Sequence, residues 1–447
     1  MLTQNSKTKM TSKFPQIVAK AKADKELKFT SLIHHINEEL LWSAALELKA
    51  DKATGIDQVS VEDYLGNGST NIANLLARLK SKAYKAKPVR RVYIPKPGKA
   101  EKRGLGIPTT EDKIVQLSAK YILEAIYEQD FLECSHGFRP ERSCHTAINR
   151  LYTTVMTKPI NYIVEVDVRK FFDNLNHYWL LRCLEERISD PNYLWLIRRF
   201  LKSGVMDGGV YADSASGAPQ GGVISPLLAN IYLHYVLDLW FEKKYKTSSK
   251  SYMELIRYCD DFVVLFESQK DATRFLEELR GRLAKFGLEV AEDKTRILEF
   301  GRIAYARSKR TGSKVSTFNF LGFTHYCKDS RNGKFVMCHK TSKDNLRRKL
   351  SDMKSFVKSV MNMLPLGMWI DTVKRKLSGH YNYFGVSGNY RCIRQYYNQV
   401  ISIMFRLLNR RSQRRSFNFT KFLECLDRYS LPQPRIKVNL YKFSYLP

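Results

Sequence analysis

The sequence predicts an α+β fold with a helical C-terminal appendage, for three reasons. Helical and strand-like spacings of apolar residues alternate as far as about residue 340. From about Thr341 onwards only the helical spacing remains. That last stretch is also strongly basic, since residues 341–447 contain 21 Lys plus Arg and 5 Asp plus Glu. We therefore expect an N-terminal extension with helices over 1–80, an α+β body over 81–340 and a basic helical domain over 341–447.

The first half of the chain mixes helices with short strands. Residues 27–49 and 110–127 carry apolar side chains every three to four positions, which predicts a helix in each. Between them, residues 89–95 form a short strand that ends at a Pro-Lys-Pro-Gly turn. Residues 160–166 are an apolar strand that we expect to be buried, and a capping Asn starts a helix over 176–188.

The second half contains the clearest pairing signal. A largely apolar helix is expected over 227–241, directly after a proline. Residues 252–258 and 262–266 are two apolar strands separated by a very short polar turn, which is the pattern of a β-hairpin. An amphipathic helix over 271–286 follows.

The composition narrows the class of protein. The 447 residues include 75 Lys plus Arg and 44 Asp plus Glu, a net charge of +31. Such an excess opposes compaction unless a polyanion neutralises it, so nucleic acid is the first partner to expect. The longest uncharged stretch, 214–237, contains prolines and glycines that would break a spanning helix, which disfavours a membrane. The eight cysteines form no CxxC pair, so reduced thiols and a cytoplasmic location are expected.

A pair of adjacent carboxylates is the sharpest single feature. Asp260 and Asp261 lie at the turn of the expected hairpin, where their mutual repulsion is costly unless cations neutralise them. Asp167 ends another apolar strand 93 residues before Asp260. Three carboxylates from two strand ends can hold two Mg²⁺ ions, as in enzymes of phosphoryl transfer. An ordinary exposed turn is the alternative, but the flanking residues are too apolar for it.

Further motifs occur in the order of one known family. Tyr258-Cys259-Asp260-Asp261, preceded by Asp167-x-x-x-Phe-Phe-Asp, resembles the palm of a reverse transcriptase. The rest of the chain resembles the group II intron-encoded reverse transcriptases over roughly residues 30–440, in these stretches: Gly55–Asp57, Tyr93–Lys99, Gly104–Thr109, Ser135–Pro140, Gly217–Gly222, Phe320–Phe323 and Gly379–Gly385. The resemblance implies a right-hand polymerase with fingers, a palm with a ferredoxin-like antiparallel sheet, and an α-helical thumb or X domain.

The same resemblance implies roles for individual residues. Asp167, Asp260 and Asp261 are the catalytic metal ligands, holding two Mg²⁺ ions with Mn²⁺ as an alternative, whereas the nearby Glu165 and Asp173 are not ligands. The residues implied for binding the incoming dNTP are Lys96, Arg103, Arg90, Gln220 and Phe171, the last as a gate against the 2′-hydroxyl, with Phe172 beside it. Leu321 and Gly322 resemble the primer grip. RNA binding is expected of the cations in the aromatic-rich tail, namely Arg406, Arg410, Arg411, Arg414 and Arg415.

The predicted function is an RNA-directed DNA polymerase that copies a bound structured RNA, with maturase activity also open to it. Its partners would be that RNA, an RNA/DNA duplex and dNTPs, without a membrane; an oligomer is left open. One alternative is a domesticated anti-phage defence reverse transcriptase that copies a noncoding RNA. Another, of a different class, is an RNA-binding splicing maturase with a silent polymerase. The tail ends at Pro447 without a Cys/His-rich endonuclease segment, so efficient cleavage of target DNA is not expected.

Overall fold

The computed structural model describes residues 13–95, 102–213, 217, 221–410 and 418–445, and the chain packs into two compact units. Unit 1 comprises the residues up to Ser143 together with Val164–Ile297. Unit 2 comprises Cys144–Ile163 and Leu298–Pro447. Compactness and function are different criteria, so the expected three-part division at residues 80 and 340 stays a prediction.

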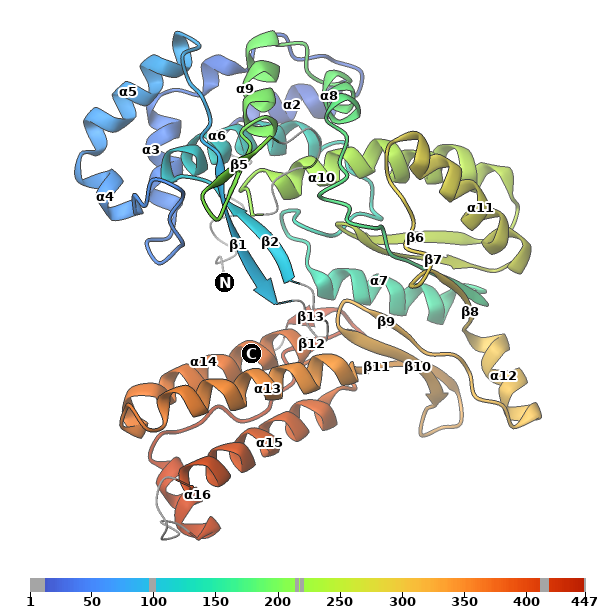
Figure 1. The fold of residues 1–447 in the computed structure, drawn as a ribbon. Helices are drawn as coiled ribbons and strands as arrows, with labels where there is room; N and C mark the ends of the chain where they lie inside the picture. Colours follow the sequence, from blue (N-terminus) through green and yellow to red (C-terminus); the bar gives the residue numbers. More distant parts are fainter. Residues whose placement is uncertain (1–12, 96–101, 214–216, 218–220, 411–417, 446–447) are drawn as a thin grey trace. The chain divides into compact units, whose positions relative to one another are not determined.

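Unit 1 is built around helix α6 (Thr110–Tyr127), which is buried along almost its whole length. Thr109 caps the start of this helix, since its hydroxyl accepts a hydrogen bond from the Asp112 N–H. Four helices contact α6: α2 (Pro15–Ala23), α3 (Glu38–Glu47), α4 (Val61–Gly66) and α10 (Ser225–Leu233). Figure 1 shows α2, α3 and α10 near it. The unit also contains α5 (Gly68–Lys80), α8 (His177–Glu185), α9 (Pro191–Leu201) and α11 (Gln269–Lys285).

Two four-stranded sheets are built mainly from residues of unit 1. The first has the order β2-β1-β4-β5, with strands β1 (Val89–Pro95), β2 (Lys102–Ile107), β4 (Val205–Asp207) and β5 (Val210–Ala212). The second has the order β6-β7-β3-β8, with strands β6 (Met253–Tyr258), β7 (Asp261–Phe266), β3 (Tyr162–Val166) and β8 (Arg296–Glu299). Strands β6 and β7 form a regular antiparallel hairpin from Met253↔Phe266 to Tyr258↔Asp261.

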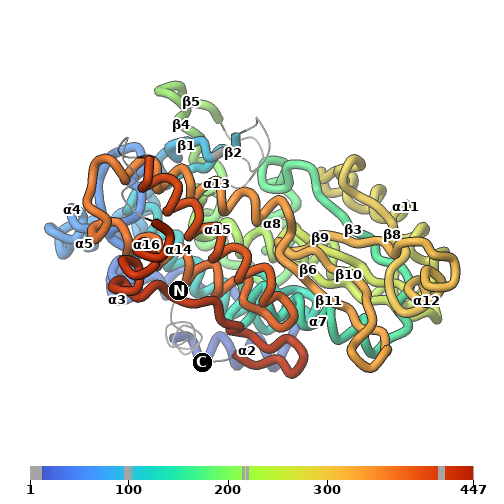
Figure 2. Tube along the Cα trace, turned by 90° about the horizontal axis from the view of Figure 1, so that it is seen from below, coloured from blue at the N-terminus to red at the C-terminus, as the bar shows by residue number. Residues whose placement is uncertain are grey.

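Unit 2 combines a small sheet with a group of helices. Its sheet has the order β11-β10-β9, from β9 (Phe318–Phe320), β10 (Phe323–Asp329) and β11 (Phe335–Thr341), and α7 (Cys144–Thr157) contacts β11. Helix α15 (Tyr390–Leu408) contacts both α13 (Lys343–Val360) and α14 (Leu366–Phe384), and these three run side by side in Figures 1 and 2. The remaining elements are α12 (Arg302–Thr311), α16 (Phe419–Asp427), β12 (Val438–Asn439) and β13 (Ser444–Tyr445).

Several elements agree with the sequence predictions. The strand over 89–95, the helix over 110–127, the hairpin and the helical C-terminal region are confirmed. The single helix over 27–49 is wrong, because the chain forms a 3₁₀ turn at Ile33–His35 and then α3. The Asp190 carboxylate explains the break, since it accepts the backbone N–H groups of Leu32 at 2.6 Å and Ile33 at 2.9 Å, in competition with a helix.

The apolar helix predicted over 227–241 is also irregular. Helix α10 ends at Leu233, and π-helical turns follow at His234–Asp238 and Phe241–Tyr245. Such turns widen the helix locally and re-aim its side chains. Within the described part of the chain, no helix has the length and apolar character needed to cross a membrane.

Candidate active site

The two adjacent carboxylates lie at the closed end of the β6–β7 hairpin. Because Tyr258 pairs with Asp261, only Cys259 and Asp260 form the loop between the strands. Cys259 has φ of 59°, the left-handed conformation that non-glycine residues rarely adopt. Its thiol is buried, and this burial, followed in effect by the nearby Asp260, raises the pKa of Cys259. Asp260 is half-buried and Asp261 is exposed, so both carboxylates are accessible at the end of two buried, apolar strands.

The third carboxylate comes from the neighbouring strand. Asp167 directly follows β3, which lies next to β7 in the sheet. Its backbone carbonyl accepts the Ala291 N–H at 2.8 Å, which ties the strand end to the segment before β8. The Asp167 side chain is 44% exposed. The sheet order therefore supplies carboxylates from the ends of two adjacent strands.

Two cations that sequence reasoning missed come from the segment before and within β8. The Lys294 ammonium donates a short hydrogen bond to Asp167 Oδ2. Two residues on, Arg296 Nε donates to Glu165 Oε2 at 2.7 Å. The two acids, Glu165 and Asp167, are two residues apart, and so are the two cations, Lys294 and Arg296. Side chains at this spacing share one face of a strand, so the matching charges are a sequence signal that β3 and β8 lie side by side. Glu165 is thus held in an ion pair, and the expectation that it is not a metal ligand stays a prediction.

The residues fit a metal ion by their chemistry but are not assembled around one. Carboxylate oxygens are the ligands that Mg²⁺ prefers. Among the described residues, however, no group of three or more His, Cys, Asp or Glu side chains is arranged to hold a metal ion. One of the three acids, Asp167, is paired with the Lys294 ammonium. A divalent ion at Asp167 would have to compete with Lys294.

We expect Lys294→Met to strengthen Mg²⁺ binding. The pair is about half-exposed on both sides, so the ammonium is worth on the order of 1 kcal/mol, or about fivefold in affinity. The Mg²⁺ concentration that gives half of the metal-induced rise in Tm should therefore fall about fivefold. Lys309→Met, which removes the exposed Lys309–Asp329 ion pair in unit 2, is the control. An unchanged Mg²⁺ midpoint in Lys294→Met would show that the ammonium does not compete with the ion.

The residues predicted to bind dNTP are only partly described. Lys96 and Gln220 lie outside the described residues, and Arg103 lies in β2 opposite Ile94 with its side chain undescribed. Gly221, next to Gln220, has φ of 117°, and a Cβ there would lie 2.6 Å from the Gly106 carbonyl oxygen. Gly221 therefore comes directly against β2, an approach that only glycine allows.

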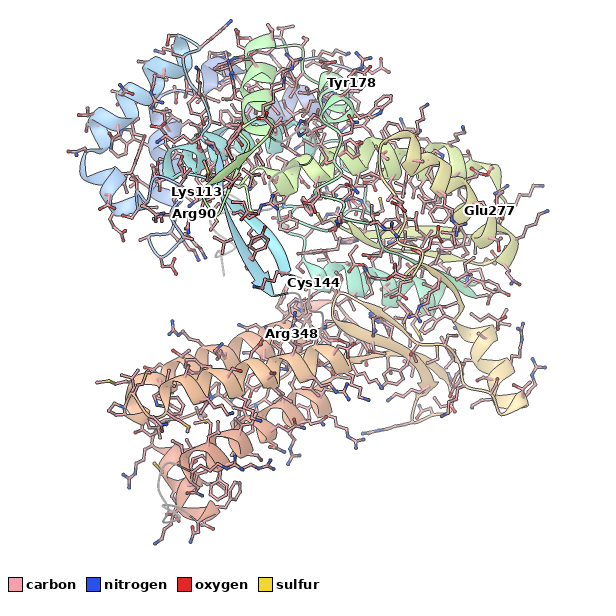
Figure 3. All side chains as sticks on the ribbon, viewed as in Figure 1. Arg90, Lys113, Cys144, Tyr178, Glu277 and Arg348 are labelled. Atoms are coloured by element: carbon pink, nitrogen blue, oxygen red, sulfur yellow. The ribbon has the colours of Figure 1, made fainter. Side chains whose placement is uncertain are left out.

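Arg90 has a structural task that the sequence did not reveal. Its Nε and Nη2 atoms both donate to the Thr54 carbonyl oxygen, at 3.1 and 2.6 Å. The Lys113 ammonium donates to the neighbouring Ala53 carbonyl at 2.6 Å, and Figure 3 shows the two cations close together. Gly55 follows this loop, and a Cβ on it would lie 2.5 Å from the Thr109 Cα. These contacts favour Arg90 as an anchor of the loop over Arg90 as a dNTP ligand.

The two phenylalanines differ in accessibility. Phe171 is 2% exposed and its ring packs edge-on to Tyr232 of α10. Phe172 is partly exposed. A Cβ on Gly217 would lie 2.9 Å from the carbonyl oxygens of Phe172 and Asp173, so Gly217 packs closely on the backbone of this segment. The expectation that Phe171 is the gate therefore conflicts with its burial, and Phe172 is the better-placed ring.

Leu321 and Gly322 form the two-residue loop between β9 and β10 in unit 2. Their φ values are 49° and 79°, so this glycine serves a hairpin turn rather than a strand bulge. The Leu321 carbonyl accepts the Tyr383 hydroxyl at 3.0 Å, and the Gly322 carbonyl accepts the Ser342 N–H at 3.0 Å. The turn is thus fixed to the helices of unit 2, and its role as a primer grip stays a prediction.

The basic tail is described only in part. Arg406 and Arg410 are exposed at the end of α15, whereas Arg411, Arg414 and Arg415 lie outside the described residues. Two aromatic side chains of this tail make ring contacts within unit 2. Tyr396 is 2% exposed and stacks on His380, and Phe405 packs against Phe419 and Phe422. The buried Tyr396 ring is therefore unsuited to stacking on bases.

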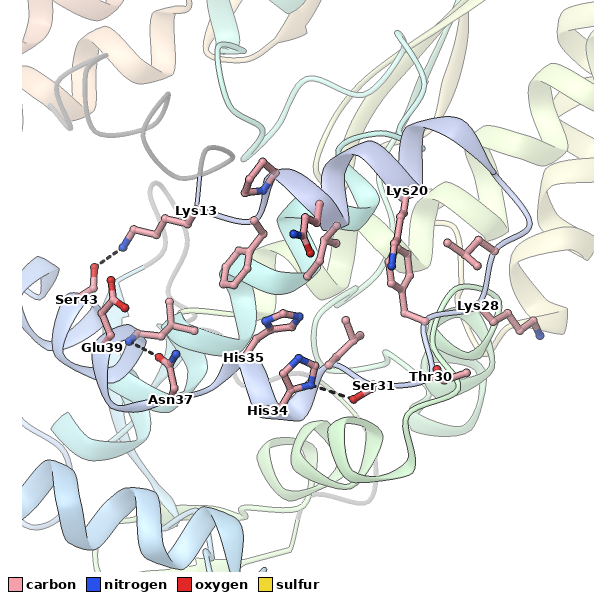
Figure 4. Close-up of a pocket in the computed structure, with 18 residues that line it drawn as sticks. Lys13, Lys20, Lys28, Thr30, Ser31, His34, His35, Asn37, Glu39 and Ser43 are labelled. Atoms are coloured by element: carbon pink, nitrogen blue, oxygen red, sulfur yellow. Dashed lines mark hydrogen bonds between the residues drawn. The ribbon is translucent and has the colours of Figure 1, made fainter.

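A separate cavity of about 870 Å³ lies among α2, the 3₁₀ turn and α3 in unit 1. Figure 4 shows His34 and His35 in it, with Ser31 bonded to His34 Nδ1 at 2.9 Å. Burial, and then the neighbouring His34, lower the pKa of His35. None of the predicted catalytic residues lines this cavity.

The site defines a class of protein before any comparison. Two acids on a hairpin turn, with a third after the adjacent strand and a helical domain following in the chain, are typical of the palm and thumb of a right-hand nucleic-acid polymerase. The model of the family "Reverse transcriptase (RNA-dependent DNA polymerase)" matches residues 94–325. The chain belongs to this family.

Its relatives include group II intron-encoded proteins, which confirms the predicted resemblance. "Group II intron-encoded protein LtrA" of Lactococcus lactis subsp. cremoris is 31% identical over 336 residues, 75% of this chain and 53% of LtrA. "Protein YkfC" of Escherichia coli K12 is 32% identical over 312 residues, 62% of this chain and 81% of YkfC. An uncharacterized 91 kDa protein in a cob intron of Schizosaccharomyces pombe is 27% identical over 413 residues, 79% of this chain and 50% of that protein. The chain thus spans about half the length of LtrA.

Proposed function

We propose that this chain is an RNA-directed DNA polymerase that copies a bound structured RNA into cDNA. The carrying observation is the placement of Asp260 and Asp261 on the β6–β7 turn, with Asp167 at the end of the next strand. The net charge of +31 supports a nucleic-acid partner, because lysines and arginines neutralise the phosphates of a bound nucleic acid. Membership of the reverse transcriptase family supports the reaction.

Asp167, Asp260 and Asp261 would hold two Mg²⁺ ions, or Mn²⁺ in their place. When bound, these ions would activate the primer 3′-hydroxyl and stabilise charge on the pyrophosphate. The chain's own residues do the positioning. Lys96 and Arg103 would contact the triphosphate of the dNTP, and Gln220 would lie beside the paired base. The rigid hairpin orients its carboxylates, since β6 and β7 are buried along most of their length.

Sequencing of the nucleic acid that co-purifies with the protein, before and after adding dNTPs, tests this function. Wild type and a doubly substituted Asp260→Asn/Asp261→Asn variant should both carry one enriched RNA. Complementary DNA should be made by the wild type alone, and its sequence would name the template. If both proteins carry the RNA and neither makes DNA, the polymerase proposal fails.

A splicing maturase is the second candidate. "Nuclear intron maturase 4, mitochondrial" of Arabidopsis thaliana is 29% identical over 141 residues, 30% of this chain. The strongly basic C-terminal region suits the binding of structured RNA. In the same sequencing experiment, a spliced intron would support the maturase, whereas a short noncoding RNA would support the defence alternative.

The gate against ribonucleotides is proposed to be Phe172. A ring beneath the sugar leaves no room for a 2′-hydroxyl, so Phe172→Ala should raise rNTP incorporation at least tenfold, about 1.4 kcal/mol in discrimination. Phe171→Ala is the matched control. Loss of this buried ring should lower the free energy of unfolding by about 3–5 kcal/mol and should leave the preference for dNTP over rNTP unchanged. Competition between dNTP and rNTP in single-nucleotide extension measures both. If Phe171→Ala changes the sugar preference and Phe172→Ala does not, Phe171 is the gate.

Lys96 is proposed to bind the triphosphate. A charge-assisted contact of this kind is worth about 1.5–3 kcal/mol, so Lys96→Ala should raise the KM for dNTP by about tenfold or more. Arg90→Met should change that KM little, because the structure engages Arg90 with Thr54. An unaltered KM in Lys96→Ala would reassign Lys96 to the solvated surface.

A further inference from the structure

Arg257 is the penultimate residue of β6 and is fully buried. Its guanidinium forms a two-pronged ion pair with Asp238, which is also fully buried, with Nε 2.8 Å from Oδ1. The remaining donors go elsewhere. Nη1 donates to Asn230 Oδ1 at 2.9 Å and to the Cys259 carbonyl at 3.0 Å, and Nη2 donates to Ser135 Oγ at 2.9 Å. Every guanidinium nitrogen therefore has a partner, as a buried cation requires.

The partners of Arg257 bring a second segment against the catalytic turn. Asn230 passes the network on, since its Nδ2 donates to the Gly137 carbonyl at 2.6 Å. The backbone of Arg257 accepts the His136 N–H at 2.8 Å. A Cβ on Gly137 would lie 2.5 Å from the Cys259 backbone nitrogen, so only glycine allows this approach. The Ser135–Gly137 part of the motif Ser135–Pro140 thus packs directly against the turn.

The turn needs such support. Cys259 is held at φ of 59°, which costs a non-glycine residue about 1–2 kcal/mol and persists only where the surroundings impose it. A buried ion pair alone contributes little net stability, because desolvation offsets its attraction. An ion pair with Asp238 also explains only two of the five guanidinium contacts. The bond to the Cys259 carbonyl lies one residue before Asp260.

We propose that Arg257 is a positioning residue that fixes the peptide between Cys259 and Asp260, and so aims the two carboxylates of the turn. Asn230 and the Ser135–Gly137 segment complete this support from below. The inference rests on the proposed function in one respect, that Asp260 and Asp261 hold the metal ions. The fixing of the turn by Arg257 follows from the contacts alone. The residues that aim the acids are therefore spread over three parts of unit 1: Ser135–Gly137, α10 with its π-helical extension, and β6.

Two variants test the proposal, with a matched control. Arg257→Lys keeps a charge for Asp238 but cannot reach Asp238, Asn230 and Cys259 at once. Asn230→Ala removes one link and no charge. Arg187→Lys is the control, because Arg187 is also a buried arginine, paired with Asp130 at 3.0 Å and bonded to Asp24 and Ala21 away from the turn. All three should lower Tm.

Only the variants at the turn should change metal binding and turnover. We expect Arg257→Lys to lower kcat at least tenfold, with the KM for dNTP within threefold of wild type, and to reduce the rise in Tm that Mn²⁺ produces. Asn230→Ala should do the same more weakly, and Arg187→Lys should leave both readouts as in wild type. If all three variants behave alike, Arg257 is structural only and the inference is overturned. If the wild type makes no DNA, the proposed function fails, and the Mn²⁺-dependent Tm, which needs no turnover, still decides the role of Arg257.

Discussion

Asn substitution of Asp260, or separately of Asp261, should abolish DNA synthesis. Asn has nearly the shape of Asp, so the two-residue turn after Tyr258 should keep its geometry. It lacks the negative charge that a divalent ion needs, and loss of several kcal/mol of transition-state stabilisation lowers kcat by about 10³-fold or more. Single-turnover primer extension on an RNA template measures the effect directly.

Stability separates this loss from misfolding. Removing one of two adjacent like charges relieves repulsion, so Tm without metal should be unchanged or higher in each Asn variant. The rise in Tm on adding Mn²⁺ should shrink. Glu165→Gln is the control, because Glu165 precedes Asp167 by two residues but is paired with Arg296, and its kcat should stay within about threefold of wild type. DNA synthesis at the wild-type rate in Asp260→Asn would move the catalytic centre away from this turn.

The sequence could predict the turn because its cause is local. Apolar residues on both sides of Cys259–Asp261 are enough to predict two buried strands and a short loop. The broken helix over 27–49 could not be foreseen, since the carboxylate that diverts the backbone of Leu32 and Ile33 belongs to Asp190, more than 150 residues away. Local propensity yields to such a distant hydrogen-bond acceptor.

The same distinction applies to the candidate site. Asp167, Asp260 and Asp261 lie in sequence motifs, so the sequence pattern was enough to find them. The cations that pair with such acids depend on which strands lie side by side in the sheet. Lys294 meets Asp167 only because both lie at the β3–β8 side of the sheet. Arg90 carries a charge that suits a triphosphate, and only the Thr54 carbonyl shows that its donors are engaged. Burial likewise distinguishes Phe171 from Phe172, which the sequence spacing did not.

Unit 2 should lose stability in mild acid because of three buried histidines. Burial lowers the pKa of His325 to about 3, with His339 adding to the shift, and burial lowers the pKa of His339 itself to about 4. Burial, and then Lys349, lower the pKa of His380 to about 3. The surroundings are mainly aromatic: Phe318 and Phe323 lie at His325, Tyr152 at His339, and Phe384, Tyr381 and Tyr396 at His380.

The sign follows from proton uptake. The unfolded chain protonates these histidines below about pH 6.5, whereas the folded unit resists until about pH 3–4. Their contribution to stability is therefore complete above pH 6.5 and is lost as the pH falls through that window. Each histidine costs about 1.4 kcal/mol per pH unit, so the three together cost about 4 kcal/mol per unit between about pH 6 and pH 4. This is a large share of the 5–15 kcal/mol typical of a folded domain.

Hydrogen exchange resolves this loss by unit. Peptides from β10, β11 and α14 should lose protection between pH 6.5 and 4.5, after correction for the intrinsic exchange rate, and before peptides from α6 in unit 1 do. His380→Phe is the matched variant. The His380 ring stacks on the Tyr396 ring with 3.8 Å between the ring centroids, and neither His380 ring nitrogen has a hydrogen-bond partner among the described residues. That variant should reduce the slope of stability against pH by about 1.4 kcal/mol per unit. An unchanged slope would mean that His380 is protonated in the folded unit as readily as in the unfolded chain, so that burial does not lower its pKa.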